Sequence, residues 1–147
     1  MWAKFLIILF YLLTITYVRA QVIDIEKSGD IIQIALPVSA FFSTIIWQDD
    51  QKPTYQFMKT MGVSFVITHG LKRIINKERP NGGNYSFPSG HTSAAFTGAA
   101  FIERKYGLKY GIPSYILASY VGWSRIQANK HDKWDVMGGV IIGIGSA

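Results

Sequence analysis

Two short polar segments hold the residue types that can handle a phosphate group, in a chain that is otherwise largely apolar. Seven of the 15 basic residues lie in these segments: Lys72, Arg73, Lys77, Arg79, Arg125, Lys130 and Lys133. Cations that are concentrated in this way, between apolar stretches, indicate an anionic ligand held at one place. A nucleic-acid surface needs a long basic face, which the sequence lacks, so we expect no nucleic-acid partner.

The first segment pairs Lys72 with Arg79 and closes on Pro80. Residues seven apart lie two turns along one helix face, so both cations can reach one anion if the segment is helical. Pro80 disfavours helix at Arg79 and marks a turn outward. By itself, a helix end rich in lysine and arginine is more typical of a solvated surface.

The tetrapeptide Pro88-Ser89-Gly90-His91 follows a glycine- and asparagine-rich loop and opens a helix. A helix start presents free backbone N–H groups and the positive end of the helix dipole, and both suit a phosphate. Gly90 lets the backbone approach the ligand closely. Ser89 either donates from its hydroxyl or caps the helix. Taken alone, the tetrapeptide is equally typical of an ordinary loop-to-helix junction.

The third group of residues is Ser124-Arg125, followed by His131 and Asp135. His131 and Asp135 are four apart, so they are neighbours if that stretch is helical. A carboxylate bonded to one imidazole nitrogen fixes the tautomer and leaves the other nitrogen free to attack. The alternative is an ordinary surface pair of histidine and aspartate.

Together, the three pieces read Lys-x6-Arg-Pro, Pro-Ser-Gly-His and Ser-Arg-x5-His-x3-Asp, in that order. This pattern resembles the type 2 phosphatidic acid phosphatase (PAP2) family, which is related to bacterial class A acid phosphatases and vanadium haloperoxidases. The resemblance implies that His131 attacks phosphorus, oriented by Asp135, and that His91 protonates the leaving alkoxide. Water then hydrolyses the phosphohistidine. The residues implied to cradle the phosphoryl oxygens are Lys72, Arg79, Ser89, Gly90 and Arg125.

Three cations on one phosphoryl group can supply the charge stabilisation that other phosphatases take from a metal. The sequence has no carboxylate cluster suited to Mg²⁺, because Asp49 and Asp50 are a pair in a loop and Asp132 adjoins the nucleophile. There is no cysteine, which excludes disulfides and thiolate metal sites. We therefore expect no metal and no cofactor.

The elements that position these motifs are expected to be helices. Apolar runs of helical character occupy residues 31–47, 54–71, 91–102, 108–123 and 135–147. No strand alternation persists between them. In 147 residues this predicts one all-α domain, a bundle of about five or six helices. The resemblance implies that this bundle is of the PAP2/haloperoxidase kind.

Residues 1–20 combine an early Lys4, a long apolar run and small residues before Gln21. They are predicted to be a signal peptide or, alternatively, an N-terminal membrane anchor, with the phosphatase domain over 21–147. Residues 21–30 are polar and are expected to connect the two. Both interpretations place the domain outside the cytoplasm.

The bundle is expected to be membrane-embedded, although residues 31–47 are only at the lower limit of spanning length. Cations do not separate onto alternate loops, so they set no topology. Residues 136–147 make about 18 Å of helix against a bilayer of about 30 Å. This predicts either a truncated last helix or a short core helix.

The leading functional hypothesis is a metal-independent phosphatase for a lipid phosphate or isoprenoid pyrophosphate. It would act at the periplasmic face of a bacterial-type inner membrane. A soluble periplasmic acid phosphatase of broad specificity is the alternative favoured by the mean hydropathy of +0.18. Vanadate-dependent halide oxidation and a non-catalytic, truncated phosphate-binding membrane protein are further alternatives. The pattern sets no oligomeric state.

Overall fold

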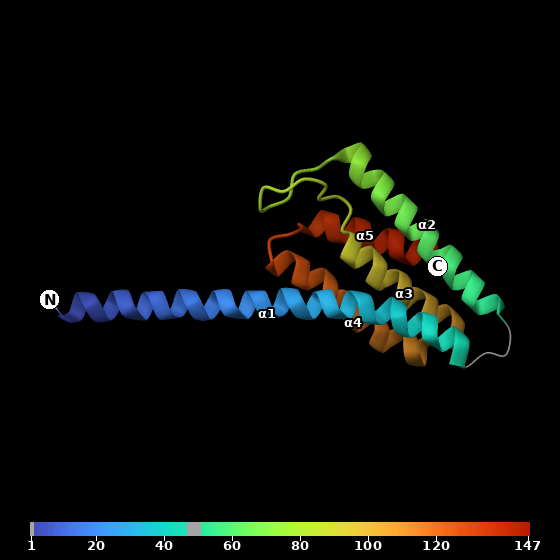
Figure 1. Ribbon diagram of the computed structural model, residues 1–147, viewed down its shortest axis with the longest axis horizontal. Coiled ribbons are helices and arrows are strands. Elements are labelled where there is room, and N and C mark those ends of the chain that lie inside the picture. The colour runs from blue at the N-terminus through green and yellow to red at the C-terminus, as the bar shows by residue number, and fades with distance from the viewer. Residues whose placement is uncertain (1, 47–50) are drawn as a thin grey trace.

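The computed structural model describes residues 2–46 and 51–147, with side chains described from Asp24 onward. Within these ranges the chain forms five helices and no strand, which confirms the predicted all-α fold. The helices are α1 (Trp2–Ile46), α2 (Lys52–Ile75), α3 (Gly90–Tyr106), α4 (Leu108–Gln127) and α5 (Lys133–Ser146) (Figure 1). The N-terminal half of α1 extends beyond the bundle that the other helices form (Figure 1).

The polar segment 21–30 belongs to α1, so the expectation that it connects two elements was wrong. Glu26 and Asp30 lie one helical turn apart: the Asp30 carboxylate accepts from Arg125 of α4, and the Glu26 carboxylate lies 3.3 Å from the Lys130 ammonium. The polarity of these two side chains therefore reflects contacts with the rest of the bundle and not a break in the helix. The predicted signal peptide or anchor over residues 1–20 lies outside the residues whose side chains are described.

Helix α3 lies at the centre of the bundle and packs against each of the other four helices. It is rich in small side chains, and ten of its residues between Thr92 and Ile102 are buried. A Cβ added at Gly98 would lie 2.9 Å from the backbone nitrogen of Pro37, so glycine is needed where α3 meets α1. This close approach fixes α1 against the middle of α3.

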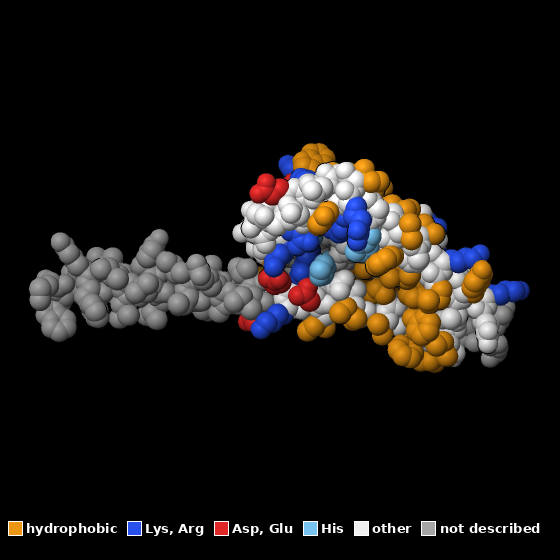
Figure 2. Space-filling model, turned by 45° about the horizontal axis from the view of Figure 1, so that its top comes forward, with side chains coloured by type: hydrophobic (Ala, Val, Ile, Leu, Met, Phe, Trp, Pro, Cys, Tyr) orange, Lys and Arg blue, Asp and Glu red, His pale blue; other side chains and the backbone are white. Residues whose placement is uncertain are grey.

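The described side chains place many hydroxyl groups inside the bundle, beside an apolar core that includes Phe57, Phe96 and Phe101, and many large apolar groups outside. Buried hydroxyl residues include Ser43, Thr44, Thr60, Ser64, Thr68, Ser93, Thr97 and Ser114. Exposed apolar residues include Ile31, Ile34, Phe65, Val66, Ile116 and Ile141, and apolar side chains cover much of the face in Figure 2. One described segment, Asp24–Ile46, is long and apolar enough to cross a membrane. Such a distribution is typical of helices packed in lipid.

Candidate active site

The chain turns sharply between Lys72 and Arg79. Helix α2 ends at Ile75, because Asn76 adopts the left-handed conformation with φ 43° and its N–H donates to the Lys72 carbonyl at 3.0 Å. Arg79 therefore lies in the following loop, and the expectation that the two cations share a helix face was wrong. The loop nevertheless returns Arg79 to the cavity that Lys72 lines.

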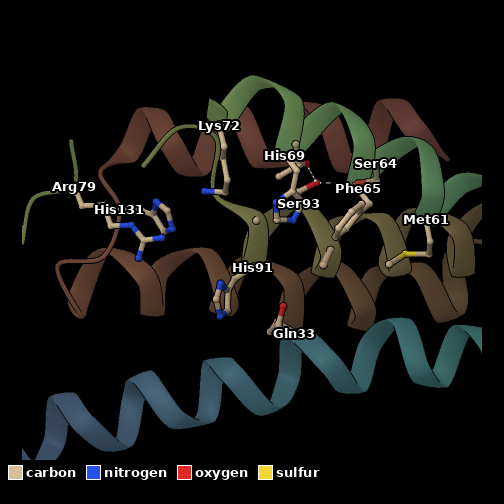
Figure 3. A pocket seen from close by; sticks show the side chains of 13 residues that line it. Gln33, Met61, Ser64, Phe65, His69, Lys72, Arg79, His91, Ser93 and His131 are labelled. Carbon is tan, nitrogen blue, oxygen red and sulfur yellow. Dashed lines mark hydrogen bonds between the residues drawn. The ribbon is translucent and has the colours of Figure 1, made fainter. Parts of the chain in front are cut away.

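A cavity of about 440 Å³ lies between α1, α2 and α3, next to the loops that precede α3 and α5 (Figure 3). It brings together five of the eight predicted site residues: Lys72, Arg79, Gly90, His91 and His131. A smaller cavity of about 160 Å³ shares Arg79, His91 and His131 with the first and adds Arg125. The remaining two, Ser89 and Asp135, are fully buried beside these cavities.

The start of α3 combines a capped helix end with an open approach to the cavity. The Ser89 hydroxyl accepts from the Thr92 N–H at 3.4 Å and from the Thr92 hydroxyl at 2.9 Å, so it caps α3. Its own hydrogen is left to donate, as a contact with phosphate would require. A Cβ at Gly90 would lie 3.6 Å from Cε of Lys72, so glycine keeps this part of the cavity open.

Lys72 is held at the cavity by the loop that follows α2. Its ammonium donates to the Tyr85 carbonyl at 2.7 Å and lies 3.5 Å from the Ser86 carbonyl. Burial, together with the nearby Arg79, lowers the pKa of Lys72 to about 8. A phosphate dianion in the cavity would favour the charged ammonium, so ligand binding and the protonation of Lys72 reinforce each other.

His131 is 3% exposed and precedes α5, so the expectation that it shares a helix with Asp135 was wrong. Its Nδ1 lies 3.6 Å from Asp135 Oδ2, beyond direct hydrogen bonding. The Ser86 hydroxyl bridges the gap: it donates to Asp135 Oδ2 at 2.5 Å and lies 3.5 Å from His131 Nδ1. Nε2 is therefore the nitrogen left for attack.

The surroundings of His131 keep its imidazole neutral. Burial is the main cause that lowers the pKa of His131 to about 4, and the positive charges of Lys72 and Arg79 add to it. Asp135 acts in the opposite direction and is outweighed. A neutral imidazole has the lone pair that a nucleophile needs, so the same cations that suit a phosphate also favour the attacking form of His131.

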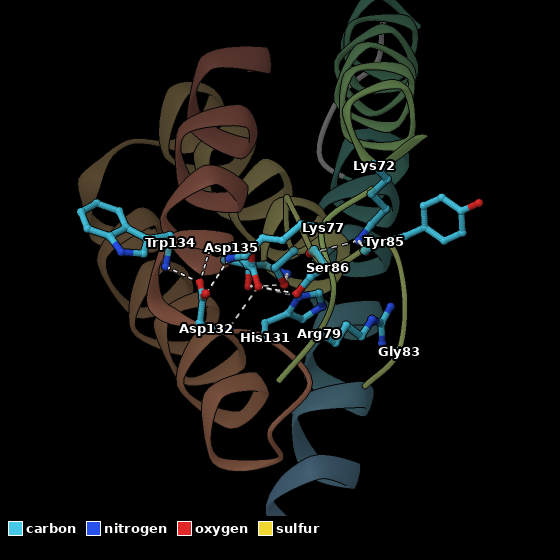
Figure 4. Close-up of polar contacts among 12 residues, drawn as sticks. Lys72, Lys77, Arg79, Gly83, Tyr85, Ser86, His131, Asp132, Trp134 and Asp135 are labelled. Atoms are coloured by element: carbon cyan, nitrogen blue, oxygen red, sulfur yellow. Dashed lines mark hydrogen bonds and ion pairs between the residues drawn. The ribbon is translucent and has the colours of Figure 1, made fainter. Parts of the chain in front are cut away.

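Lys77 shares its ammonium between two carboxylates (Figure 4). It lies 2.5 Å from Asp132 Oδ2 and 2.8 Å from Asp135 Oδ1. Burial opposes ionisation of Asp135, but hydrogen bonds from Lys77, Ser86 and the Asp132 backbone outweigh it and lower the pKa of Asp135. Asp132 also caps α5 by accepting from the Trp134 and Asp135 N–H groups. Asp135 is therefore an ionised, fixed partner behind His131.

Helix α1 contributes a carboxylate to the site that the three motifs do not include. Asp30 Oδ1 lies 3.1 Å from His91 Nε2 and 2.6 Å from Arg125 Nη1. The other guanidinium arm, Nη2, donates to the Glu26 carbonyl at 2.5 Å. Arg125 is 2% exposed and is thus clamped by α1 in the absence of ligand.

Motif spacing missed three residues, namely Asp30, Lys77 and Ser86. Each contacts a motif residue from a distant or irregular part of the chain. The signal in the sequence was weak. Asp30 belongs to an acidic pair four residues apart before an apolar run, Lys77 was one of the clustered cations without a role of its own, and Ser86 had no signal. Within the described part of the chain, no group of three or more metal-ligand side chains converges. Asp132 and Asp135 are instead engaged by Lys77.

Comparison with known proteins finds a family match over nearly the whole chain. The sequence model of the PAP2 superfamily matches residues 5–147. The lipid A 1-phosphatase of Porphyromonas gingivalis is 41% identical over 70 residues, which are 45% of this chain and 16% of that protein. The lipid A 1-phosphatase of Helicobacter pylori is 30% identical over 108 residues, 67% of this chain and 54% of that protein. The matches thus span about half or less of these curated relatives.

The fold is also shared with a solved structure. The crystal structure of Aquifex aeolicus LpxE matches with a TM-score of 0.74 at 22% identity. The match covers 86% of this chain and 82% of that chain.

Proposed function

This chain belongs to the PAP2 superfamily, and we propose that it is a metal-independent phosphatase that removes phosphate from a membrane lipid through a phosphohistidine intermediate. One observation carries the proposal: the larger cavity is cationic at one end and apolar at the other. Lys72, Arg79, His91 and His131 line the first end, and Met61 and Phe65 line the second (Figure 3). A molecule with a phosphate attached to an apolar body fits that division.

The proposed reaction uses each residue at a stated atom. Lys72, Arg79 and the Gly90 N–H bind the phosphoryl oxygens. His131 attacks with Nε2, and a P–N bond forms as the P–O bond to the leaving group breaks. His91 gives its proton to the departing oxygen and becomes neutral. Water then attacks the phosphohistidine, its proton returns to His91, and inorganic phosphate leaves with both histidines restored.

We place the substrate among phosphorylated glycolipids of the lipid A kind. Two relatives are named lipid A 1-phosphatases, and the middle of the cavity supports the same choice. The Gln33 amide lines it on the α1 side, and Ser64 and Ser93 lie on the other side, where their buried hydroxyls bond each other at 2.8 Å. The Gln33 amide can bond a sugar hydroxyl beside the phosphate site, a contact that a prenyl chain cannot use.

The apolar exterior supports a position in the inner membrane over a soluble periplasmic enzyme. Large apolar side chains are exposed along α1, α2, α4 and α5, where water would disfavour them. We place the site on the periplasmic side, because a signal peptide or anchor over residues 1–20 would direct the domain out of the cytoplasm.

A substrate panel tests the proposal. We expect the detergent-solubilised protein to release phosphate from lipid A with a kcat/KM at least about tenfold above that for undecaprenyl pyrophosphate, phosphatidic acid or nitrophenyl phosphate. Preference for the soluble ester would favour the acid-phosphatase alternative. Halide oxidation that depends on added vanadate would favour the haloperoxidase alternative. Binding of phosphate without turnover of any substrate would contradict the proposal that the protein is an enzyme.

Activity should persist in excess EDTA, and vanadate should inhibit competitively. Lys72 and Arg79 supply positive charge at the cavity, so transition-state stabilisation needs no ion. Vanadate takes the geometry of a transferring phosphoryl group and should occupy the same cradle. Rates with EDTA, with added Mg²⁺ and with added Zn²⁺ should agree within about twofold. Loss of activity in EDTA that Mg²⁺ or Zn²⁺ restores would contradict the site.

A further inference from the structure

Two of the three histidines that line the cavity, His91 and His131, face a carboxylate through one ring nitrogen. His131 faces Asp135 through Nδ1, with Ser86 between them. His91 faces Asp30 through Nε2, at 3.1 Å. Asp30 lies more than forty residues before the first motif, in helix α1, which packs closely against α3 at Gly98. The two pairs thus use opposite ring nitrogens, and His91 keeps Nδ1 available.

We propose that Asp30 is a positioning residue for the general acid. Its carboxylate holds His91 by Nε2, so that Nδ1 presents the proton to the leaving group, and the same oxygen fixes Arg125 beside it. The inference rests on the proposed function, because it takes His91 as the acid. A residue of α1 thereby completes a site whose motifs all lie in later elements.

The charges around His91 explain why an acid there needs such a partner. Arg79 approaches it from the loop after α2, Arg125 from α4 and His131 from the loop before α5, while Lys72 of α2 shares the cavity. Burial first, and then Arg125, lower the pKa of His91, whereas Asp30 raises it. Asp30 is the carboxylate that contacts His91 among the described residues. Its charge opposes loss of the proton that catalysis requires.

Asp30 accepts no proton in the proposed cycle. When the P–O bond breaks, the Nδ1 proton of His91 passes to the leaving oxygen, and the imidazole remains neutral against the carboxylate. When water attacks the phosphohistidine, Nδ1 takes the water proton and the imidazolium–carboxylate pair forms again. No proton needs to reach Asp30, so its amide analogue removes the charge and keeps the shape.

The test compares Asp30→Asn with Asp24→Asn, which makes the same exchange on an exposed residue of the same helix. For an alkyl phosphate, the alkaline limb of kcat/KM should move about one pH unit lower in Asp30→Asn. Its kcat at neutral pH should fall about tenfold or more, and the loss with a nitrophenyl ester should be smaller. Asp24→Asn should match the wild type. In Asp30→Glu the alkaline limb should lie between those of Asp30→Asn and the wild type.

A direct measurement separates this inference from the proposed function. An NMR titration of the His91 ring reports its pKa without turnover, and that pKa should be lower in Asp30→Asn than in the wild type. An unchanged His91 pKa and an unchanged alkaline limb, with only lower thermal stability, would overturn the proposal in favour of a tether between α1 and α4. Tighter vanadate binding with undiminished kcat would also overturn it, since Asp30 would then compete with phosphate. An inactive wild type would instead count against the proposed function alone.

Discussion

His131→Ala is expected to abolish turnover, lowering kcat at least about a thousandfold on lipid and nitrophenyl esters alike. Among the described histidines, His131 is the one whose pKa is lowered to about 4 and whose Nδ1 faces a buried, ionised carboxylate. His91 is held by Asp30 and His69 stacks on Phe65 at 4.2 Å between ring centroids, so neither replaces it. The fall in kcat should be the same for both leaving groups, because the covalent intermediate cannot form with either.

Trapping of the intermediate checks this result. Acid quenching of the wild type with labelled substrate should leave acid-labile phosphate on the protein, and His131→Ala should leave none. The melting temperature and the elution profile in detergent show whether the variant is folded. A folded variant that retains more than about a hundredth of the wild-type kcat would show that His131 is not the nucleophile.

The motifs predicted which residues meet, because each motif marks where a helix begins or ends and such ends gather on one side of a bundle. Lys72 closes α2, His91 opens α3, Arg125 closes α4 and Asp135 opens α5. Apolar runs likewise predicted the helices. Their number and order follow from periodicity and length, which are local properties of the chain.

The contacts that tune the site could not be predicted in this way. Ser86 and Lys77 lie in an irregular loop whose path depends on the left-handed Asn76 and on tertiary hydrogen bonds such as Ser86 N–H to Lys77 O at 2.7 Å. Asp30 reaches Arg125 because the neighbouring Gly29 lets α1 approach α4: a Cβ at Gly29 would lie 2.6 Å from Arg125 Nη2. Residues 21–30 resembled a linker because their polar side chains serve these contacts. The spacing of residues along the sequence does not predict such tertiary contacts.

His91→Ala should separate the acid from the nucleophile by its dependence on the leaving group. With an alkyl phosphate, we expect kcat to fall about a hundredfold to a thousandfold, because the alkoxide must be protonated as it leaves. With nitrophenyl phosphate the loss should stay below about tenfold, since a nitrophenolate is stable without a proton. Initial rates on the two esters, measured for the wild type and for both histidine variants, give the comparison.

The pH dependence of kcat/KM gives an independent test of His131 as the nucleophile and His91 as the acid. The wild-type kcat/KM should fall in acid near pH 4, as His131 becomes protonated and loses its lone pair. It should fall in alkali below the ordinary histidine value of 6.5, because the lowered pKa of His91 means that its proton is lost early. His91→Ala should keep the acid limb and lose the alkaline fall that His91 causes, so that activity falls only near pH 8, where Lys72 loses its proton. If His91→Ala and His131→Ala instead lose activity in equal proportion on both esters, the two histidines do not divide the roles of acid and nucleophile. The carboxylates behind them would then serve the fold of the bundle and not the chemistry of the cavity.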